Sequence, residues 1–375
     1  MKILVAGISV RAMVESAVHS GYSVIALDAF GDQDLHKLTE AHSLHHDFHA
    51  RYSSRALYEA GRQLDFDSVA YTSNLENHPE VLNCFSRNHQ IIGNAPEVIR
   101  RVRCWAALLA KVRQAGFLFP NTIFDGNNGH RKSGGTWLIK PVLSGGGHGI
   151  SFAQKNERPG QQFLLQEYIP GVPCSASFVA NEYECVVIGI TEQLIGLPQL
   201  GAKGFRYCGN ILPFPDPGRS MLEQVRRLAK FLTREFGLVG VNGMDFILKG
   251  DQVVLTEVNP RYSASMELIE MAYGLPVFQL HMRAVLEQKL PEFKLEDVVN
   301  TRRFFGKGIL FAEKDAVAPG TRDWPARGIR DIPESGEKLR RGSPICTILT
   351  GRPSYAETLA ELISQASTLK REIYG

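Results

Sequence analysis

The N-terminal part of the chain alternates short apolar runs with amphipathic stretches. Residues 2–6 are an apolar run typical of a buried strand, Gly7-Ile-Ser marks a turn, and residues 11–20 fit a helix that ends at Gly21. Residues 24–27 then predict a strand with Asp28 at its carboxyl end, and residues 68–72 predict another. Because strands that alternate with helices usually pair in parallel, this region predicts a small open parallel sheet.

The pattern changes after a predicted helix over residues 96–115. Strands now follow one another with no helix between them, at residues 136–141, 149–153, 163–168 and 175–180. A second helix over residues 220–236 precedes strands 243–248 and 253–258, which form a hairpin around Lys249-Gly-Asp. Closely spaced strands of this kind are typical of antiparallel sheets.

The last part of the chain differs again. Residues 308–312 and 345–350 predict short strands on either side of a proline- and glycine-rich stretch, and residues 354–368 predict a closing helix. The expected class is therefore a combination of α/β and α+β structure. We divide the chain into four expected units, residues 1–95, 96–172, 173–290 and 291–375.

Composition narrows the classes of function. A chain of 375 residues has room for two or three domains, and its formal charge of +3 is too small to indicate a nucleic-acid binder. Six cysteines occur without any CxxC pair, which favours reduced thiols over disulfides or a zinc site. With no signal-peptide pattern and no apolar run of about 20 residues, we expect a cytoplasmic protein that does not enter membranes.

The hairpin carries the strongest candidate chemistry. Side chains alternate along a strand, so Glu257 and Asn259 share one face, and Arg261 lies just beyond the strand end. Neighbouring oxygen ligands suit Mg²⁺. Asp245 joins them only if a three-residue loop or a bulge sets the register, because a two-residue turn alone puts it on the opposite face. An exposed acidic edge is the alternative.

A lysine followed by glycines gives the second candidate. Lys140 ends a predicted strand, where its ammonium group can reach a phosphate, and Ser144, Gly145, Gly146 and Gly147 follow it. Glycines permit a loop whose N–H groups surround phosphate oxygens. In the Walker A motif the lysine follows the glycines and opens a helix, so this order is different. A flexible surface hairpin remains the alternative.

The segment Leu165-Gln-Glu-Tyr-Ile-Pro-Gly is a weaker third candidate. An extended strand that ends at Pro-Gly predicts a hinge between two lobes. The backbone of such a hinge could meet an adenine edge, with Glu167 accepting from the exocyclic amine. Similar runs end many strands, so this motif indicates little alone.

Taken in order, these motifs resemble the ATP-grasp superfamily over residues 95–285, and in particular a carboligase-like branch related to biotin carboxylase and to tyramine–glutamate ligase-type enzymes. The resemblance implies an ATP-grasp fold: a Rossmann-like N-terminal domain, a two-lobed antiparallel ATP-binding core and a small β-rich C-terminal domain.

The resemblance also implies roles for single residues. Lys140 would contact the ATP phosphates together with the glycine loop, and Glu167, Tyr168 and Ile169 would meet the adenine. Asp245, Glu257 and Asn259 would hold Mg²⁺ or Mn²⁺. Lys140 and Arg261 would be catalytic, with Arg261 facing the γ-phosphate or an acyl phosphate. The family often has an acidic residue for the ribose after the hinge, whereas this chain has Val172-Pro-Cys-Ser, so the ribose contact is unassigned.

Substrates are expected at the carboxyl ends of the parallel strands. The candidates there are Ser9, Arg11, Glu76 and Asn77, with Arg11 for a carboxylate and Glu76 for an ammonium group. An exposed arginine at a helix start, and a glutamate that only caps a loop, are the alternatives. Asp28 resembles a ribose-binding acid, but the turn lacks the GxGxxG spacing, which argues against NAD.

Two further features carry less weight. His42, His45, His46 and His49 have helical spacing, yet no ladder of acids accompanies them, and a solvated histidine-rich surface is the favoured interpretation. The glycine-rich stretch at residues 201–209 could cover the active site.

The function expected is ligation: a carboxylate of an amino acid or small acid is activated as an acyl phosphate and joined to an amine, with release of ADP and phosphate. The partners would be small molecules, without nucleic acid or membrane, and a homodimer is a candidate assembly because similar proteins often dimerise. Two alternatives stay open, a bicarbonate-activating carboxylase and an ATP-binding regulatory module without turnover.

Overall fold

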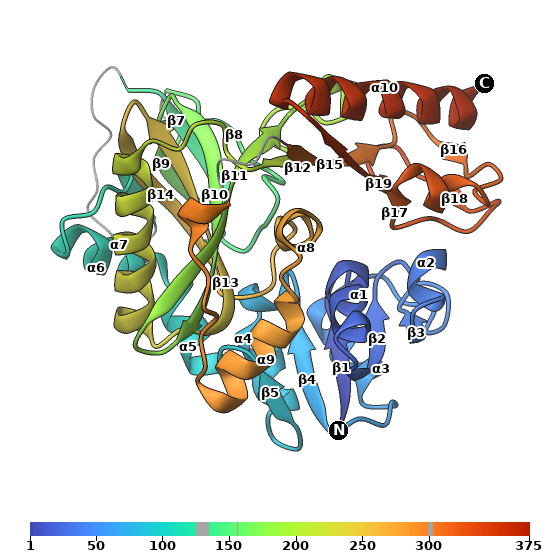
Figure 1. Cartoon of the computed structure of the whole chain (residues 1–375), viewed down its shortest axis with the longest axis horizontal. Coiled ribbons are helices and arrows are strands. Elements are labelled where there is room, and N and C mark those ends of the chain that lie inside the picture. Colours follow the sequence, from blue (N-terminus) through green and yellow to red (C-terminus); the bar gives the residue numbers. More distant parts are fainter. Residues whose placement is uncertain (125–134, 156, 299–302) are drawn as a thin grey trace.

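The computed structural model describes residues 1–124, 135–155, 157–298 and 303–375. These residues contain one parallel sheet and three antiparallel sheets, of eight, four and two strands (Figure 1). The mixed α/β and α+β class expected from the sequence is confirmed. Among the described residues, no helix is both long enough and apolar enough to cross a bilayer.

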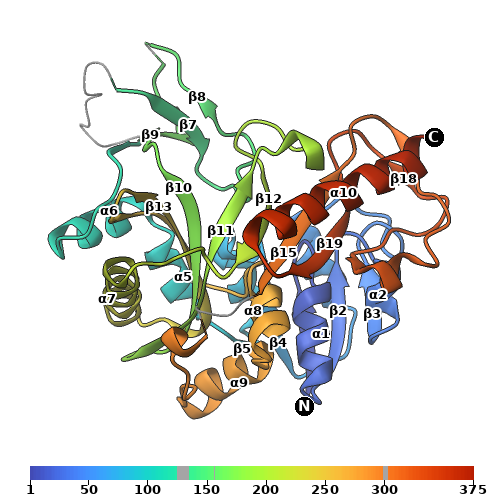
Figure 2. The ribbon, with the colours of Figure 1, turned by 45° about the horizontal axis from the view of Figure 1, so that its top comes forward.

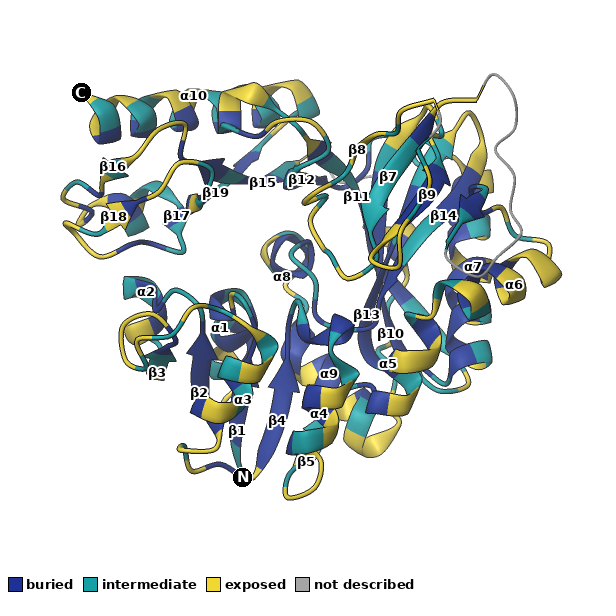
Figure 3. Cartoon of the chain, turned by 180° about the vertical axis from the view of Figure 1, so that it is seen from behind, coloured by how far each residue is buried: buried dark blue, intermediate teal, exposed yellow. Residues whose placement is uncertain are grey.

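The N-terminal sheet has five parallel strands in the order β3-β2-β1-β4-β5. Its strands are β1 (Lys2–Ala6), β2 (Ser23–Asp28), β3 (Glu40–Ser43), β4 (Ser68–Tyr71) and β5 (Gln90–Ile92). The helical segments around it are α1 (Arg11–His19), α2 (Gln33–His36), α3 (Ser54–Gly61), the 3-10 turn η1 (Leu75–Asn77) and α4 (Pro79–Phe85). The apolar runs seen in the sequence are the buried central strands of this sheet (Figure 3).

The helix predicted over residues 96–115 is two helices, α5 (Pro96–Val102) and α6 (Trp105–Gln114). The chain breaks at Cys104, whose backbone is extended, with φ −75° and ψ 106°. Arg103 caps the end of α5 with backbone angles still in the helical region, and its guanidinium group bonds to Glu257 on a distant strand. A tertiary contact of this kind overrides the continuous helical pattern.

A four-stranded antiparallel sheet follows, in the order β6-β9-β7-β8. Its strands are β6 (Thr122–Ile123), β7 (Trp137–Pro141), β8 (Ser151–Phe152) and β9 (Phe163–Glu167). β7 brings Lys140 to its end, opposite Leu164 of β9. The sheet projects away from the rest of the chain in Figure 2, as the smaller of two lobes would.

The sheet with the most strands is an eight-stranded antiparallel sheet in the order β14-β13-β10-β11-β12-β15-β19-β17. Its strands are β10 (Val172–Asn181), β11 (Cys185–Ile195), β12 (Tyr207–Leu212), β13 (Val239–Lys249), β14 (Gln252–Asn259), β15 (Phe304–Phe311), β17 (Ile329–Arg330) and β19 (Pro344–Arg352). β15, β17 and β19 lie after residue 290, in the expected C-terminal unit, yet they pair into the same sheet as the strands of the expected unit 173–290. β16 (Ala316–Val317) and β18 (Lys338–Leu339) pair separately.

Helices cover this large sheet because each has an apolar stripe. α7 (Arg219–Phe236) buries Val225, Leu228 and Leu232 at helical spacing and ends at Gly237, whose φ is +71°. α10 (Tyr355–Tyr374) begins at Ser354, whose hydroxyl accepts from the Glu357 N–H, and it packs on β15 and β19 (Figure 2).

The remaining helical segments complete the fold. They are α8 (Met266–Tyr273), α9 (Val277–Glu287) and the 3-10 turns η2 (Pro198–Leu200), η3 (Leu295–Asp297) and η4 (Trp324–Arg327). α8 and α9 share one apolar core with the N-terminal sheet, where Phe278 meets Tyr22. The hairpin β13–β14 is thereby joined directly to the N-terminal domain.

Candidate active site

The β13–β14 hairpin brings three of the predicted side chains together. Its turn is the two-residue Gly250-Asp251, because Lys249 pairs with Gln252. A register shift next to Asp245 leaves Thr256 without a partner in the ladder, so Asp245 lies opposite Glu257. The Thr256 hydroxyl donates to the Asp245 carbonyl at 3.0 Å. The condition set from the sequence, a longer loop or a bulge, is met by the bulge.

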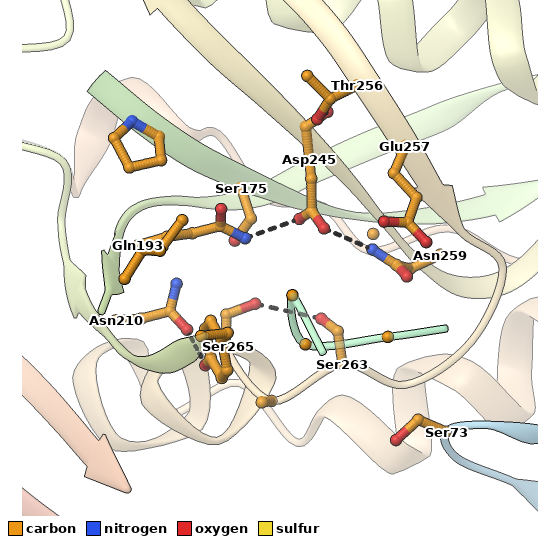
Figure 4. A pocket seen from close by; sticks show the side chains of 18 of the residues that line it. Ser73, Ser175, Gln193, Asn210, Asp245, Thr256, Glu257, Asn259, Ser263 and Ser265 are labelled. Carbon is orange, nitrogen blue, oxygen red and sulfur yellow. Dashed lines mark hydrogen bonds between the residues drawn. The ribbon is translucent and has the colours of Figure 1, made fainter. Parts of the chain in front are cut away.

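Asp245 is the more perturbed of the two acids. Its carboxylate accepts from the Gln193 and Asn259 side-chain amides, each at 3.0 Å (Figure 4). Burial, and then the charge of Glu257, raise the pKa of Asp245 to about 7. Burial also acts to raise the pKa of Glu257, but Arg103, Lys140 and Arg261 outweigh it and hold that pKa below its usual value. The two carboxylates, on paired strands, are therefore both stabilised by the charges of Lys140 and Arg261.

These residues fit a hard divalent cation. Within the part of the chain that the structure describes, no group of three or more His, Cys, Asp or Glu side chains could hold a metal. The candidate set is instead two carboxylates and the amide of Asn259, oxygen donors that suit a cation completed by water and substrate phosphates. The pKa of Asp245 is raised chiefly by burial and then by the charge of Glu257, so a cation held by these residues would stabilise the ionised carboxylate.

Two arginines flank the acids. Arg261 follows β14, and its Nη2 and Nη1 donate to Asn259 Oδ1 at 3.3 Å and to the Tyr262 carbonyl at 3.0 Å. Arg103, from the break between α5 and α6, donates to Glu257 and to the Val258 carbonyl. Arg103 was not predicted, since one sequence carries no signal that its helix would break.

Lys140 lies on the same cavity from the small lobe. Its Nζ donates to Gln166 Oε1 at 3.1 Å and lies 5.4 Å from the centre of the Trp105 ring. Burial lowers the pKa of Lys140, and the charge of Glu257 opposes that shift. The ammonium group therefore faces the acidic hairpin across the cavity.

The glycine loop after Lys140 contacts the glycine-rich segment 201–209. The Tyr207 N–H donates to the Gly146 carbonyl at 2.9 Å. Gly147 has φ +71°, and a Cβ there would lie 1.8 Å from the Phe205 carbonyl oxygen. Only glycine allows this approach. The predicted cover is thus in contact with the predicted phosphate loop.

The hinge segment forms another wall. Asn121 donates to the Glu167 carboxylate from its side chain and its backbone, and the Tyr168 N–H donates to the Thr136 carbonyl at 2.9 Å. The Tyr168 ring lies 5.5 Å from Phe152, between centroids, in an edge-on pair at the cavity mouth. Glu167 therefore has a partner within the chain.

One cavity of about 580 Å³ joins these elements, and Figure 4 shows its polar floor. The predicted residues that line it are Ser9, Arg11, Lys140, Gly145, Gly146, Gly147, Glu167, Tyr168, Ile169, Asp245, Glu257, Asn259 and Arg261. Ser144, Glu76 and Asn77 are not among the described lining residues. The chain thus brings most of the candidates to a single space.

Arg11 is not the exposed helix-start residue considered above. It is 1% exposed, and its Nε and Nη2 donate to the Asp331 carboxylate at 2.9 and 3.3 Å. Its Nη1 bonds to Glu267, which also accepts from Lys307 Nζ at 2.6 Å. The donors expected for a substrate carboxylate are therefore occupied by carboxylates of the chain.

The histidine cluster has no helical face. His42 lies in β3 beside Glu40, and the later three histidines lie in the turn and loop that follow and are exposed. The helix suggested by the spacing of these histidines is not present in residues 42–49, all of which the structure describes. The favoured interpretation, a solvated surface, agrees with the exposure of the later three. Asp28 is buried and accepts from the N–H groups of Val10, Phe30 and Gly31, which fixes the first turn.

Comparison with known families identifies an ATP-grasp domain at residues 106–265. ATP-grasp enzymes use ATP and Mg²⁺. The matched range contains Lys140, the glycine loop, the hinge and the acidic hairpin, which are the elements that line the cavity.

Individual proteins extend the likeness over more of the chain. An uncharacterized protein of Methanocaldococcus jannaschii is 25% identical over 93% of this chain and 88% of its own length. A formate-dependent phosphoribosylglycinamide formyltransferase of Prochlorococcus marinus (strain NATL1A) is 30% identical, but the match spans only 44% of this chain and 45% of that enzyme. The solved structure of an L-amino acid ligase from Bacillus licheniformis covers 100% of the chain and 98% of its own, with a TM-score of 0.70 at 16% identity. That likeness establishes the fold.

Proposed function

We propose that this chain, whose residues 106–265 match an ATP-grasp domain, is a carboxylate–amine ligase that uses ATP and releases ADP and phosphate. The observation that carries the proposal is the pairing of Asp245 with Glu257 across the bulge, facing Lys140 and Arg261 over one cavity. Two acids beside two cations is the arrangement that phosphoryl transfer needs.

The chemistry follows in two steps. A carboxylate oxygen of the substrate attacks the γ-phosphorus, the bond to the β-phosphate oxygen breaks, and ADP leaves. The amine then attacks the carbonyl carbon of the acyl phosphate, phosphate departs, and the amine loses a proton. No covalent bond to the enzyme is required.

The residues of the chain would divide this work. Asp245, Glu257 and Asn259 would hold Mg²⁺ or Mn²⁺, which when bound neutralises charge on the phosphates. Lys140 would bind the transferring phosphoryl group from the opposite wall, and Arg261 would stabilise its oxygens as negative charge shifts to ADP. The contact between Gly146 and Tyr207 would keep water away from the acyl phosphate.

The hinge would receive the purine. In this proposal Ile169 offers its N–H, and Glu167 accepts from the exocyclic amine while Asn121 holds its carboxylate in place. Ser9, with Thr72 and Ser73 beside it in the cavity lining, would bind the substrate acid or the amine.

The test is incubation of the purified chain with Mg-ATP and pooled amino acids, amines and small carboxylic acids, with and without bicarbonate. ADP and phosphate that depend on one organic pool support the proposal. ADP release that depends on bicarbonate alone would favour the carboxylase, AMP and pyrophosphate would contradict γ-phosphoryl transfer, and firm ATP binding without turnover in any pool would favour the regulatory module.

A further inference from the structure

A short turn of the N-terminal domain lies directly behind the proposed catalytic groups. The 3-10 turn η1 is buried, and the Leu75 and Asn77 N–H groups donate to carbonyls of the preceding residues. Tyr52 donates to Asn74 at 3.2 Å, and the Ile8 N–H donates to the Ser73 carbonyl at 2.6 Å. The turn is therefore fixed to its own domain, while Ser73, two residues before the turn, lines the cavity.

One arm of this turn holds Arg261. Glu76 Oε1 lies 2.7 Å from Arg261 Nε, and the two side chains are 2% and 11% exposed. The other two guanidinium nitrogens donate to Asn259 and to the Tyr262 carbonyl. Glu76 thus holds the Nε edge of the guanidinium group by charge, in an ion pair without hydrogen-bond geometry, while Asn259 and the Tyr262 carbonyl bind the other two nitrogens.

A second arm holds Glu257. Arg103 Nη2 donates to Asn77 Oδ1, while its Nη1 donates to the Glu257 carboxylate and to the Val258 carbonyl at 3.1 Å. Arg103 is not among the described lining residues of the cavity, so its contact is with the ligand-bearing carboxylate. Removing its charge would free Glu257 to rotate and would alter the charge that holds it ionised.

From these contacts we infer that η1 is a positioning element: Glu76 orients Arg261, and Asn77 acts through Arg103 to orient Glu257. The roles of Arg261 and Glu257 rest on the proposed function, but the coupling of η1 to the nucleotide end of the cavity does not. In place of the substrate contact expected for Glu76, the carboxylate acts through an arginine. Neither Glu76 nor Asn77 is required to touch substrate or nucleotide.

The coupling is tested first on the unaltered chain, by hydrogen exchange with and without Mg²⁺ and a non-hydrolysable ATP analogue. We expect slower exchange of the amides of residues 74–77 in the complex, although none of these residues is among the described lining residues of the cavity. The Arg103→Lys variant loses the bidentate bridge, so at saturating analogue its η1 amides should gain much less protection. Where calorimetry shows that the analogue binds, equal exchange with and without it in the unaltered chain would overturn the inference, whatever the enzyme's activity; absence of binding would instead contradict the proposed function.

The positioning role is tested by kinetics in whichever substrate pool supports ADP release. For Glu76→Gln we expect kcat to fall about 10- to 100-fold, with the KM for ATP within about threefold, because ATP binding does not need the oriented arginine. Glu76→Asp should recover part of the rate. Glu80→Gln, an exposed glutamate beside His78, is the matched control and should leave both constants unchanged.

The outcomes separate the two proposals. Absence of ADP release in every pool would contradict the ligase but leave the exchange experiment to decide on η1. A Glu76→Gln enzyme with unchanged kcat would contradict the positioning role, even where the ligase activity is established. A rise in the KM for the organic substrate alone would instead assign Glu76 to substrate binding.

Discussion

Two buried ion clusters border the same cavity and differ in how they are satisfied. At one end, Arg11 binds Asp331 and Glu267, and Lys307 binds Glu267, so that these charges are answered inside the chain. At the other end, Arg261 and Lys140 face Asp245 and Glu257, and burial leaves Asp245 with a pKa raised to about 7. The first cluster joins α1, α8, β15 and the end of β17, whereas the second retains groups that a ligand could use.

A buried charge can stabilise the fold or serve the reaction, and its residue type does not say which. Arg11 and Arg261 both line the cavity, but the type of residue does not distinguish a structural lock from a catalytic group. The acids beside each arginine do: Asp331 and Glu267 pair directly with Arg11, whereas the hydrogen bonds that Asp245 accepts come from the neutral amides of Gln193 and Asn259. Substitutions in the first cluster should therefore act on stability, and substitutions in the second should act on turnover.

The largest effect is expected for Arg11→Met, which leaves Asp331 and Glu267 buried with a missing partner. We expect the free energy of unfolding to fall by about 3–5 kcal/mol, measured by denaturant titration. Arg62→Met, which breaks an exposed pair with Glu59, is the control and should cost at most about 1 kcal/mol. Equal losses in the two variants would break the comparison.

Glu257→Gln should act mainly on turnover. The substitution keeps the shape of the side chain but removes the charge shared by Arg103 and the proposed metal, so we expect ADP release to fall about 10²- to 10³-fold. The melting temperature should change little by comparison. Glu223→Gln on the exposed face of α7 is the matched control. A variant that keeps its rate would remove Glu257 from the mechanism.

His281 belongs with the self-satisfied groups. Its Nδ1 accepts from the Val241 N–H and its Nε2 faces the Ile92 carbonyl, while burial lowers its pKa to about 4. Between about 6.5 and 4 the unfolded chain takes up a proton that the folded chain refuses, so stability falls as the pH falls through this window.

The gap between these pKa values corresponds to about 3 kcal/mol. Denaturant titrations at several pH values, compared with His281→Gln, measure this contribution. If the two proteins lose stability in parallel as the pH falls, the histidine is not the cause.

A smaller effect is expected in the glycine loop. In Gly147→Ala the Cβ meets the Phe205 carbonyl at a positive φ, a strain of about 1–2 kcal/mol, so we expect roughly tenfold weaker binding of Mg-ATP by calorimetry. Gly145→Ala is the control, since its Cβ would meet nothing within 4 Å. Similar affinities for both variants would show that the contact between the loops is not used.

The sequence was most informative where chemistry is local. Alternation along one strand was enough to put Glu257 and Asn259 on one face. A shared face with Asp245 required a three-residue loop or a bulge, and the structure has the bulge, at Thr256. The parallel N-terminal sheet followed from apolar runs alone. These features depend on neighbours within a few residues, or on one hairpin.

Contacts between segments far apart in the chain could not be predicted from the sequence. Asp331 follows Arg11 by 320 residues, and Glu257 follows its partner Arg103 by 154 residues. Glu76 and Asn77 were recognised as candidates, but their neighbours Arg261 and Arg103 could not be. The helical spacing of the histidines does not reflect a helix, because His42 lies in β3, the edge strand of the parallel sheet.

In the proposed reaction, a carboxylate oxygen of the substrate attacks the γ-phosphorus of ATP. The most direct measurement uses the organic acid identified by the pooled assay, labelled with ¹⁸O in its carboxylate, and follows the label by mass spectrometry of the released phosphate. The account predicts one ¹⁸O transferred to phosphate in each turnover, with equimolar ADP. Unlabelled phosphate, or label found in AMP, would contradict an acyl phosphate formed at this site.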